Sequence, residues 1–366
     1  MTRVAVLGGG IVGLSVAWSL VGRGLEVVLV DAELPGRSSP VAAGMISAAA
    51  ELEHGEPDLW ELTSLSQRRW PEFAAALARC GGAPLQLRRT GTLLVAMDQD
   101  EEIRLDRRLR LLADAGVAAE LLDRSELRRR EPGIATTVRG AAWLPNDLCV
   151  ERNRALNALR SALRKAGAEL VEGVGRLRVT GERVVGIDVA AGTVFADHVV
   201  LSAGWRSGTA AAPGVLPTDL SGHDGIRPVK GELIDLEVAA PAVHAMIRTR
   251  VDRVPVYLVP HDDHHLTVGA TSEQVGADTN PTVRAAHDLL VAATTVVPEL
   301  RDAAIVAHRV GLRPAMTDNR PLLGSSPRPG LTVATGHYRH GFLLAPLTAE
   351  IVGDRVVHAL SQGDLS

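Results

Sequence analysis

Val4-Ala5-Val6-Leu7-Gly8-Gly9-Gly10-Ile11-Val12-Gly13 opens the stretch that decides the fold, and Glu26-Val27-Val28-Leu29-Val30-Asp31 closes it. The order is an apolar strand, a glycine turn, an apolar helix and a second apolar strand that ends on an acid, which is a complete dinucleotide-binding unit. In that unit Gly8 permits the tight turn, Gly10 lets the backbone approach a pyrophosphate, and Gly13 lets the helix pack close to the strand. The stretch therefore predicts a nucleotide cradle.

The two ends of this unit supply the remaining contacts. Backbone amides at the start of the helix, at Ile11 and Val12, would face the phosphates with the positive end of the helix dipole. Asp31 can accept hydrogen bonds from an adenosine ribose. The pattern does not separate FAD from NAD, so the rest of the chain must decide between them.

The same run has a second interpretation. From Val4 to Gly22 it is uncharged after a lone Arg3, and by length alone it fits a membrane span or the apolar part of a signal peptide. Its three consecutive glycines would each cost a helix about 1 kcal/mol relative to alanine. We therefore expect the nucleotide cradle and no membrane span.

Composition narrows the function classes. The chain has 366 residues, 46% of them hydrophobic, with 39 Lys+Arg against 43 Asp+Glu, enough for one large or two ordinary domains. A net charge of -4 offers no basic field for phosphates, so nucleic acid is not an expected partner. Cys80 and Cys149 lie far apart without a C-x-x-C, which argues against a disulfide scaffold or a zinc site and favours a cytoplasmic location. The two lysines, Lys165 and Lys230, lie outside any P-loop motif.

Helix-type and strand-type segments alternate along the chain. Helices are predicted at 59–79, where Pro71 should split the helix in two, and at 98–115 and 153–166; strands are predicted at 169–174 and 195–201. Strands at 92–95, 229–236, 254–259, 266–270 and 305–309 should form one mostly antiparallel sheet. Two interleaved domains explain this alternation better than two domains in series.

Several further stretches carry a family resemblance. They are Ala42-Ala43-Gly44-Met45, Val256-Tyr257-Leu258-Val259-Pro260, Val268-Gly269-Ala270-Thr271, Gly311-Leu312-Arg313-Pro314 and Gly336-His337-Tyr338-Arg339-His340-Gly341. Together with the glycine unit, they make the chain resemble the D-amino-acid-oxidase-like FAD-dependent oxidoreductases. Within that family it is most similar to the glycine-oxidising branch that serves thiamine biosynthesis. The resemblance covers nearly the whole length.

This resemblance implies an α/β fold in which a Rossmann-type FAD-binding domain is interleaved with a mostly antiparallel-sheet substrate domain. The expected FAD-binding domain comprises residues 1–86, 146–222 and 312–366, and the expected substrate domain comprises residues 87–145 and 223–311. Related amine oxidases that attach flavin through a cysteine have no match near the carboxyl end. We therefore expect FAD to be bound non-covalently.

The resemblance also implies a set of catalytic residues. Tyr257 and Arg313 would hold the carboxylate of an amino acid, for which the planar guanidinium fork is well suited. Arg339 would be a second arginine near the substrate. Without the resemblance, Tyr257 could equally be a residue of the sheet core and Arg339 a surface arginine before a helix.

The cofactor contacts follow from the glycine unit, the small-residue turn at 202–205 and the resemblance. Ala42 to Ile46 would line the isoalloxazine ring, Val174 would contact the adenine through its backbone, and a helix starting at Gly341 would point its positive end at the flavin. The expected FAD contacts are Gly8, Gly10, Ile11, Val12, Gly13, Asp31, Ala42, Ala43, Gly44, Met45, Val174, Ala203, Gly204, Trp205, Arg313, His337, Arg339, His340, Gly341, Phe342 and Leu343.

The expected substrate pocket is formed by Met45, Ser272 and His340. Ser272 stands where the glycine-oxidising pattern has a methionine, and His340 replaces a commoner asparagine, so the pocket differs in volume and polarity. His261-Asp262-Asp263-His264-His265 could suggest metal ligands, but its place between two strands favours a polar hairpin turn, and we expect no metal.

The expected activity is FAD-dependent oxidative deamination of glycine, other small amino acids or N-methyl amines. It would give the 2-oxo acid through an imine, with ammonia and hydrogen peroxide, and would serve thiamine thiazole synthesis. The expected partners are a small amino acid and molecular oxygen, and a homo-oligomer stays open. The alternatives are a D-amino-acid dehydrogenase that passes electrons to a quinone or carrier, an NAD-dependent dehydrogenase, and a flavin-binding structural or regulatory protein.

Overall fold

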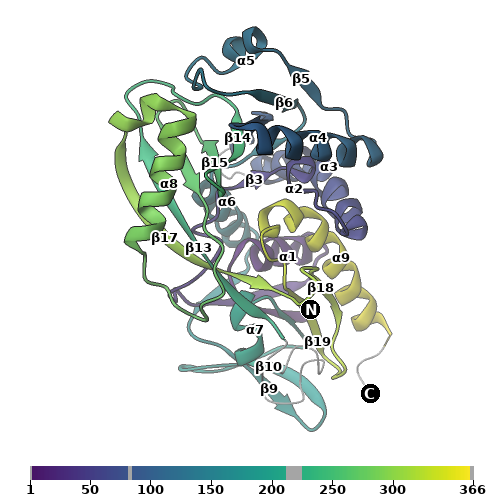
Figure 1. Cartoon of the computed structure of the whole chain (residues 1–366). Coiled ribbons are helices and arrows are strands. Elements are labelled where there is room, and N and C mark those ends of the chain that lie inside the picture. Colours follow the sequence, from purple (N-terminus) through teal and green to yellow (C-terminus); the bar gives the residue numbers. More distant parts are fainter. Residues whose placement is uncertain (1, 81–84, 212–224, 363–366) are drawn as a thin grey trace.

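The computed structural model describes residues 2–80, 85–211 and 225–362. Within these residues most strands belong to two large sheets, one of six strands and one of eight. In Figure 1 most strands of the eight-stranded sheet lie in the upper part of the view and the six-stranded sheet lies below. The α/β class with one mostly parallel and one mostly antiparallel sheet is the class that the sequence predicts.

The six-stranded sheet carries the glycine unit. Its order is β18 (Leu322–Ser325), β19 (Leu331–Thr335), β12 (His198–Leu201), β1 (Arg3–Leu7), β2 (Glu26–Asp31) and β8 (Glu169–Glu172). All neighbouring pairs are parallel except β18 with β19. The carboxyl ends of β1, β2 and β12 therefore meet at one edge, where parallel sheets bind ligands.

Both faces of this sheet are covered. Val4 and Val6 of β1 belong to a core shared with helices α1 (Ile11–Gly22), α3 (Pro57–Arg79), α6 (Arg152–Lys165) and α9 (Gly341–Ser361). Ala5 and Leu7 point the other way, into a core shared with a small antiparallel sheet of β9 (Arg176–Thr180), β10 (Arg183–Val189) and β11 (Gly192–Phe195). Because β1 is apolar on both faces, its run is continuous rather than alternating.

The run from residue 4 to residue 22 is thus a strand, a turn and a helix. Helix α1 begins after Gly10 and is apolar on most sides because it is packed between the sheet and other helices. Among the described residues, we find no helix with the length and apolar character needed to cross a bilayer.

The eight-stranded sheet has the predicted, mostly antiparallel character. Its order is β17 (Ala304–Ala315), β13 (Arg227–Glu237), β16 (His265–Gly269), β15 (Val254–Pro260), β14 (Met246–Val251), β4 (Thr92–Ala96), β6 (Gly140–Leu144) and β5 (Glu120–Leu122). Only β14 and β4 pair in parallel among these strands. Helix α8 (Val283–Val296) packs on one face of the sheet, and α4 (Gln99–Asp114) packs against β4.

Short elements connect these layers. They are β3 (Met45–Ile46), α2 (Ala48–Glu51), α5 (Arg124–Arg130), β7 (Leu148–Cys149), η1 (Gly204–Arg206), α7 (Ser207–Ala210) and η2 (Pro298–Asp302). The predicted domain boundaries stay predictions, and the boundary between residues 222 and 223 lies outside the described residues.

Two predictions of local structure were wrong. Pro71 does not split its helix, because α3 runs unbroken through it. The buried Trp70 beside it packs against α9 and donates its Nε1–H to the carbonyls of Phe342 and Leu343, and this packing outweighs the cost of an interior proline, about 3 kcal/mol. The predicted strand at 195–201 is two strands, since β11 ends at Phe195 in the small sheet and β12 starts at His198 in the large one.

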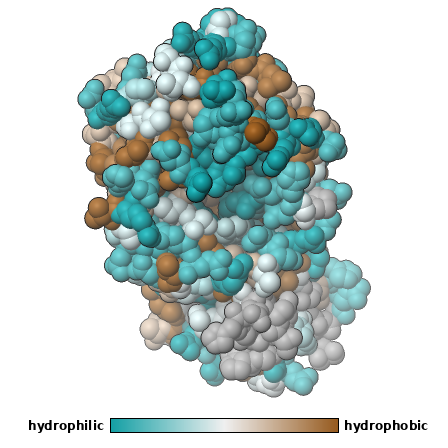
Figure 2. Space-filling model, in the orientation of Figure 1, coloured by the Kyte–Doolittle hydropathy of each residue, from teal (hydrophilic) through white to brown (hydrophobic). Residues whose placement is uncertain are grey.

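The surface is mainly polar on the face that Figure 2 shows, with apolar side chains scattered over it. Exposed apolar residues on the described chain include Val283 and Val291 of α8 and Ile305 and Val306 of β17. Scattered apolar residues are ordinary on a protein surface.

Candidate cofactor and substrate site

Two cavities meet at the carboxyl edge of the parallel sheet. The first, about 290 Å³, lies at the glycine turn; the second, about 450 Å³, lies between the two large sheets. Both are lined by Ile11, Ser38, Ser39, Tyr338 and Gly341. One elongated hollow therefore runs from the glycine turn to the eight-stranded sheet.

Nearly all the predicted site residues line this hollow. The first cavity is lined by Gly8, Gly10, Ile11, Val12, Asp31, Val174, Ala203, Gly204, Trp205, His337 and Gly341. The second is lined by Ala42, Ala43, Gly44, Met45, Tyr257, Ser272, Arg313, Arg339, His340, Gly341, Phe342 and Leu343. Gly13 is not among the lining residues of either cavity.

The glycine turn is too tight for side chains. Gly8 has a φ of +113°, and a Cβ there would overlap the carbonyl of Ser202. A Cβ on Gly13 would overlap the carbonyl oxygen of Gly8, so α1 packs directly against the turn. A cradle of bare backbone is what a pyrophosphate requires. Ser39, which the sequence did not single out, accepts a hydrogen bond from the Ile11 N–H at 3.0 Å.

Asp31 shapes the turn as well as facing the cavity. Its Oδ1 accepts the Gly9 N–H at 2.8 Å, and its Oδ2 accepts Nη2 of Arg37 at 2.7 Å. A Cβ on Gly9 would overlap this carboxylate. An ionised carboxylate has about four lone-pair sites, so Asp31 retains acceptor capacity for a ribose hydroxyl.

Trp205 offers an unpaired donor in the same cavity. Its buried Nε1–H has no hydrogen-bond partner among the described residues, and its ring is stacked by the guanidinium of Arg206 at 4.2 Å from the ring centroid. A buried N–H without a partner costs free energy unless a ligand accepts it. With the bare glycine turn, this donor shows that the cavity fits a dinucleotide.

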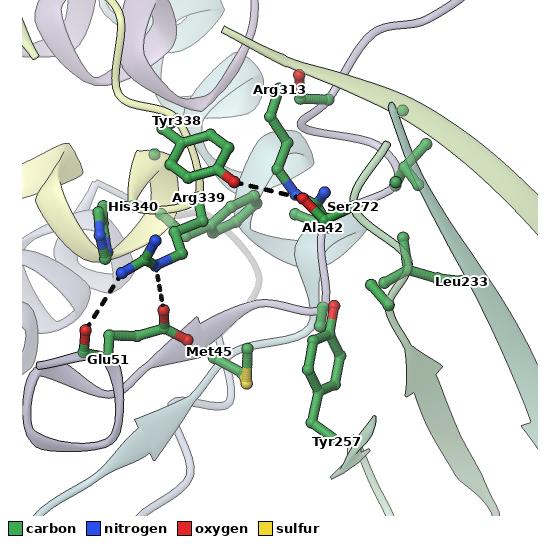
Figure 3. A pocket seen from close by; sticks show the side chains of 18 of the residues that line it. Ala42, Met45, Glu51, Leu233, Tyr257, Ser272, Arg313, Tyr338, Arg339 and His340 are labelled. Carbon is green, nitrogen blue, oxygen red and sulfur yellow. Dashed lines mark hydrogen bonds and ion pairs between the residues drawn. The ribbon is translucent and has the colours of Figure 1, made fainter. Parts of the chain in front are cut away.

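Arg313 and Tyr257 both line the second cavity (Figure 3). Each also lies over a glycine of a neighbouring strand. A Cβ on Gly231 would lie 2.5 Å from the Arg313 Cζ, and one on Gly269 would lie 2.5 Å from the Tyr257 ring. Gly269 is the direct cross-strand partner of Tyr257. The absence of a side chain on each of these glycines therefore makes room for Arg313 and Tyr257.

The chemistry of this pair suits a carboxylate. Arg313 Nη1 donates to the Thr271 carbonyl at 3.0 Å, which fixes the guanidinium. Burial raises the pKa of the Tyr257 hydroxyl, although the nearby Arg313 opposes this effect. Tyr257 is therefore a protonated hydrogen-bond donor at neutral pH.

Arg339 lies in the same cavity, but its guanidinium is turned toward Glu51 (Figure 3). Its Nε donates to Glu51 Oε2 at 2.6 Å, and Arg248 Nη1 donates to the other oxygen of the same carboxylate. Burial alone would raise the pKa of Glu51, but Arg248 and then Arg339 hold it at about 2. The sequence missed Glu51 and Arg248, because their partners are remote in the chain.

Ser272 and Tyr338 close one side of the cavity. Their hydroxyls lie 3.4 Å apart and share a hydrogen bond (Figure 3). Tyr338 has a φ of +47°, and the Arg339 guanidinium carbon lies 5.5 Å from its ring centroid. Tyr338 joins both cavities and is a further lining residue that the predicted site omitted.

Two buried histidines precede α9. Burial lowers the pKa of His340 to about 4 and that of His337 to about 3. His337 Nε2 bonds the Thr348 hydroxyl at 2.9 Å, whereas neither ring nitrogen of His340 has a partner among the described residues. Both rings are therefore neutral at pH 7.

His337 should make the protein sensitive to acid. Because its folded pKa lies below its ordinary value of 6.5, the unfolded chain binds the extra proton between about pH 6.5 and pH 3, and stability is lost as pH falls through this window. The variant His337→Gln should lose about 2 kcal/mol less free energy of unfolding between pH 7 and pH 5 than the parent. Urea unfolding at both pH values measures this, with the exposed His287→Gln as the control; an equal loss in all three proteins would contradict the prediction.

A buried ionic cluster holds the loop that carries Thr271 and Ser272. Lys230, 1% exposed, donates from Nζ to Asp278 Oδ2 at 2.7 Å and lies 3.2 Å from Glu232 Oε1. Glu232 is fully buried, and its backbone N–H donates to the Thr271 hydroxyl at 3.0 Å. The cluster therefore ties this loop to β13.

Removal of the Lys230 charge should destabilise the protein. Lys230→Met removes the ammonium beside the buried Glu232 and leaves the carboxylate with His308 Nε2 at 2.8 Å and the two hydrogen bonds from Thr282. This loss should lower the free energy of unfolding by about 3 kcal/mol. Urea unfolding followed by circular dichroism measures the change. Lys165→Met, which alters an exposed lysine on α6, should stay within about 0.5 kcal/mol of the parent. Equal unfolding midpoints for the two variants would refute the expectation.

The predicted hairpin turn is confirmed. Residues 261–264 connect β15 to β16, and Asp262 Oδ1 accepts the backbone N–H groups of His264 and His265. In the part of the chain that the structure describes, no group of three or more His, Cys, Asp or Glu residues is placed to hold a metal ion.

Known proteins resemble this chain over its whole length. A family model described as FAD dependent oxidoreductase matches residues 3–355. The glycine oxidase of Pseudomonas aeruginosa is 32% identical over 359 residues, which cover 96% of this chain and 94% of that protein. The crystal structure of glycine oxidase from Bacillus cereus has a TM-score of 0.87 at 26% identity and covers 98% of this chain and 95% of that one.

A longer relative matches along part of its length. The bifunctional protein ThiO/ThiG of Trichormus variabilis is 31% identical over 371 residues, which cover all of this chain and 54% of that protein. The chain therefore spans about half the length of this relative.

Proposed function

Since this chain belongs to the FAD-dependent oxidoreductase family, we propose that it oxidises glycine and other small amino acids or N-methyl amines. With oxygen and water as co-reactants, the products from an amino acid would be the 2-oxo acid, ammonia and hydrogen peroxide, and an N-methyl amine would release methylamine in place of ammonia. The observation that carries this proposal is the pairing of Arg313 and Tyr257 above Gly231 and Gly269, in the cavity that continues from the glycine turn.

FAD would be held non-covalently along the hollow and, when bound, would accept the hydrogen and electron pair removed from the substrate α-carbon. The bare backbone of the glycine turn and the unpaired Trp205 N–H would bind its pyrophosphate and adenosine half. Ala42 to Met45 would line its ring system, and the amides at the start of α9, from Gly341 to Leu343, would bring positive partial charge to it.

The substrate would be oriented through its carboxylate. Arg313 can present two parallel N–H groups to the two oxygens, and Tyr257 can donate its hydroxyl to one of them. Met45, Leu233 and Phe342 line the same cavity with apolar groups and would exclude water from the reacting carbon. Positioning and electrostatics then suffice, without a side chain that transfers a proton.

We also propose a role in thiamine thiazole synthesis, in the cytoplasm. The likeness to the bifunctional protein ThiO/ThiG supports the pathway, and the free thiols of Cys80 and Cys149 are in keeping with a reducing compartment. Restoration of thiamine-independent growth to a host that lacks its own glycine-oxidising enzyme tests this role.

The activity is tested with the purified protein. It should be yellow, and glycine added without oxygen should bleach the flavin absorbance. Each turnover in air should yield one hydrogen peroxide. A flavin that stays oxidised with glycine, sarcosine and small D-amino acids would exclude the proposed activity, and reduction that is reversed by a quinone but not by oxygen would identify a dehydrogenase instead.

A further inference from the structure

The second cavity holds more positive charge than one carboxylate needs. Among the described residues, the arginines that line it are Arg248, Arg313 and Arg339. Arg313 alone accounts for the substrate carboxylate in the proposed function. The guanidiniums of Arg248 and Arg339 are not needed for that carboxylate.

Glu51 occupies both of them. It is the last residue of α2, its side chain is 9% exposed, and it lines the same cavity. Its two carboxylate oxygens accept from different arginines, Arg248 on β14 and Arg339 just before α9. One buried anion therefore joins β14 to the segment before α9 and pairs with two guanidiniums at the substrate site.

Arg248 and Glu51 lie close enough to Tyr257 to affect a substrate bound there. Arg248 is the direct cross-strand partner of Tyr257 on β15. Both Arg248 and Glu51 influence the pKa of the Tyr257 hydroxyl, with opposite signs. A ligand held by Tyr257 would therefore experience both charges.

The other acids nearby make longer or more exposed contacts. Glu53 lines the mouth of the cavity with its side chain about half exposed, and it pairs with Arg108 at 3.4 Å. Glu56 lies 3.6 Å from Arg339 Nη2. These exposed or longer pairs contribute little, so Glu51 is the anion that sets the charge inside the cavity.

We propose that Glu51 is a specificity-determining residue that selects substrates with a single carboxylate. By pairing with Arg248 and Arg339, it competes with a second anionic group for these two cations and places a like charge where such a group would lie. The cavity therefore accepts neutral small amino acids and rejects amino dicarboxylates. This inference rests on the proposed function for its substrate class, and it is an example of selection by repulsion.

The test compares two substrates that differ by one carboxylate, D-alanine and D-aspartate. The parent holoenzyme should favour D-alanine in kcat/KM. Glu51→Gln keeps the size of the side chain but removes its charge, so two guanidiniums become available to the second carboxylate. The ratio of kcat/KM for D-aspartate to that for D-alanine should rise about tenfold or more.

Two variants show whether the effect belongs to this cluster. Glu53→Gln removes one negative charge at the cavity mouth and should leave the ratio within about twofold of the parent. In the Glu51→Gln background, Arg248→Gln should cancel much of the gain, because one of the released cations is gone. An unchanged ratio in Glu51→Gln, or an equal rise in Glu53→Gln, would overturn the proposal.

Ligand binding to the parent gives a result that needs no variant. Acetate and malonate, monitored by their perturbation of the flavin spectrum, should bind with similar affinity, or malonate should bind more weakly. Malonate binding more than tenfold tighter than acetate would overturn the proposal even if Glu51→Gln fails to fold. If the parent binds acetate in preference to malonate but oxidises no amino acid, the proposed function fails and the charge selection stands.

Discussion

Replacement of Arg313 by methionine should lower kcat/KM for glycine by about a thousandfold, mainly through a higher KM. The substrate carboxylate would lose two charge-assisted hydrogen bonds, each of which contributes about 1.5–3 kcal/mol. Arg313→Lys should recover part of the loss, because an ammonium keeps the charge but cannot form the planar pair. Steady-state oxygen uptake over a range of glycine concentrations measures both variants.

A matched control lies on the same strand. Arg309 of β17 pairs with Asp235 and is not among the residues that line either cavity. Arg309→Met should keep KM within about twofold of the parent. An Arg313→Met enzyme with full flavin absorbance and a parent-like KM would show that the carboxylate is bound elsewhere.

Substitution of Gly13 by alanine should give a protein that purifies nearly colourless. The added Cβ would overlap the carbonyl oxygen of Gly8, so α1 must move away from the turn that cradles the pyrophosphate. The expected cost is about 3 kcal/mol of folding free energy, together with loss of FAD affinity. The ratio of flavin to protein absorbance and the thermal midpoint measure the two effects.

Gly22 provides the control in the same helix. A Cβ there would meet nothing within 4 Å, and alanine is a better helix former by up to about 1 kcal/mol. Gly22→Ala should therefore keep its colour and melt no lower than the parent. If Gly13→Ala retains full flavin occupancy, the close packing of α1 on the turn is not what maintains the cofactor site.

The parts of the site that could be predicted from sequence are those encoded locally. Gly8 and Gly13 can be recognised because the turn that needs them lies within a few residues of each. The mostly antiparallel character of the eight-stranded sheet could be predicted for the same reason, because each strand can be recognised from its own local sequence. The assignment of FAD came from the family resemblance, since the glycine pattern alone left NAD open.

The remainder depends on register and on long-range contacts. Nothing in the sequence around Gly231 and Gly269 indicates a special role. Only the strand pairing places them beneath Arg313 and Tyr257. Glu51 meets its two arginines across 197 and 288 residues of sequence. No local sequence pattern could predict such contacts.

The same limit explains the errors. Pro71 was expected to break its helix, but α3 continues through it because the packing of Trp70 on α9 outweighs the local cost of the proline. Phe195 and His198 belong to different sheets although only two residues separate them. The roles of individual residues in binding FAD or substrate stay predictions, which the variants above test.

The interleaving of the sheets also bears on the time at which the cofactor can be captured. The hollow is walled on one side by the turn after β1 and on the other by residues 334–343, and α9 packs directly on α1. A chain made from its amino end cannot close this hollow until residues 334–343 have left the ribosome. We therefore expect FAD to be taken up only after residues 334–343 have emerged and α9 has packed on α1.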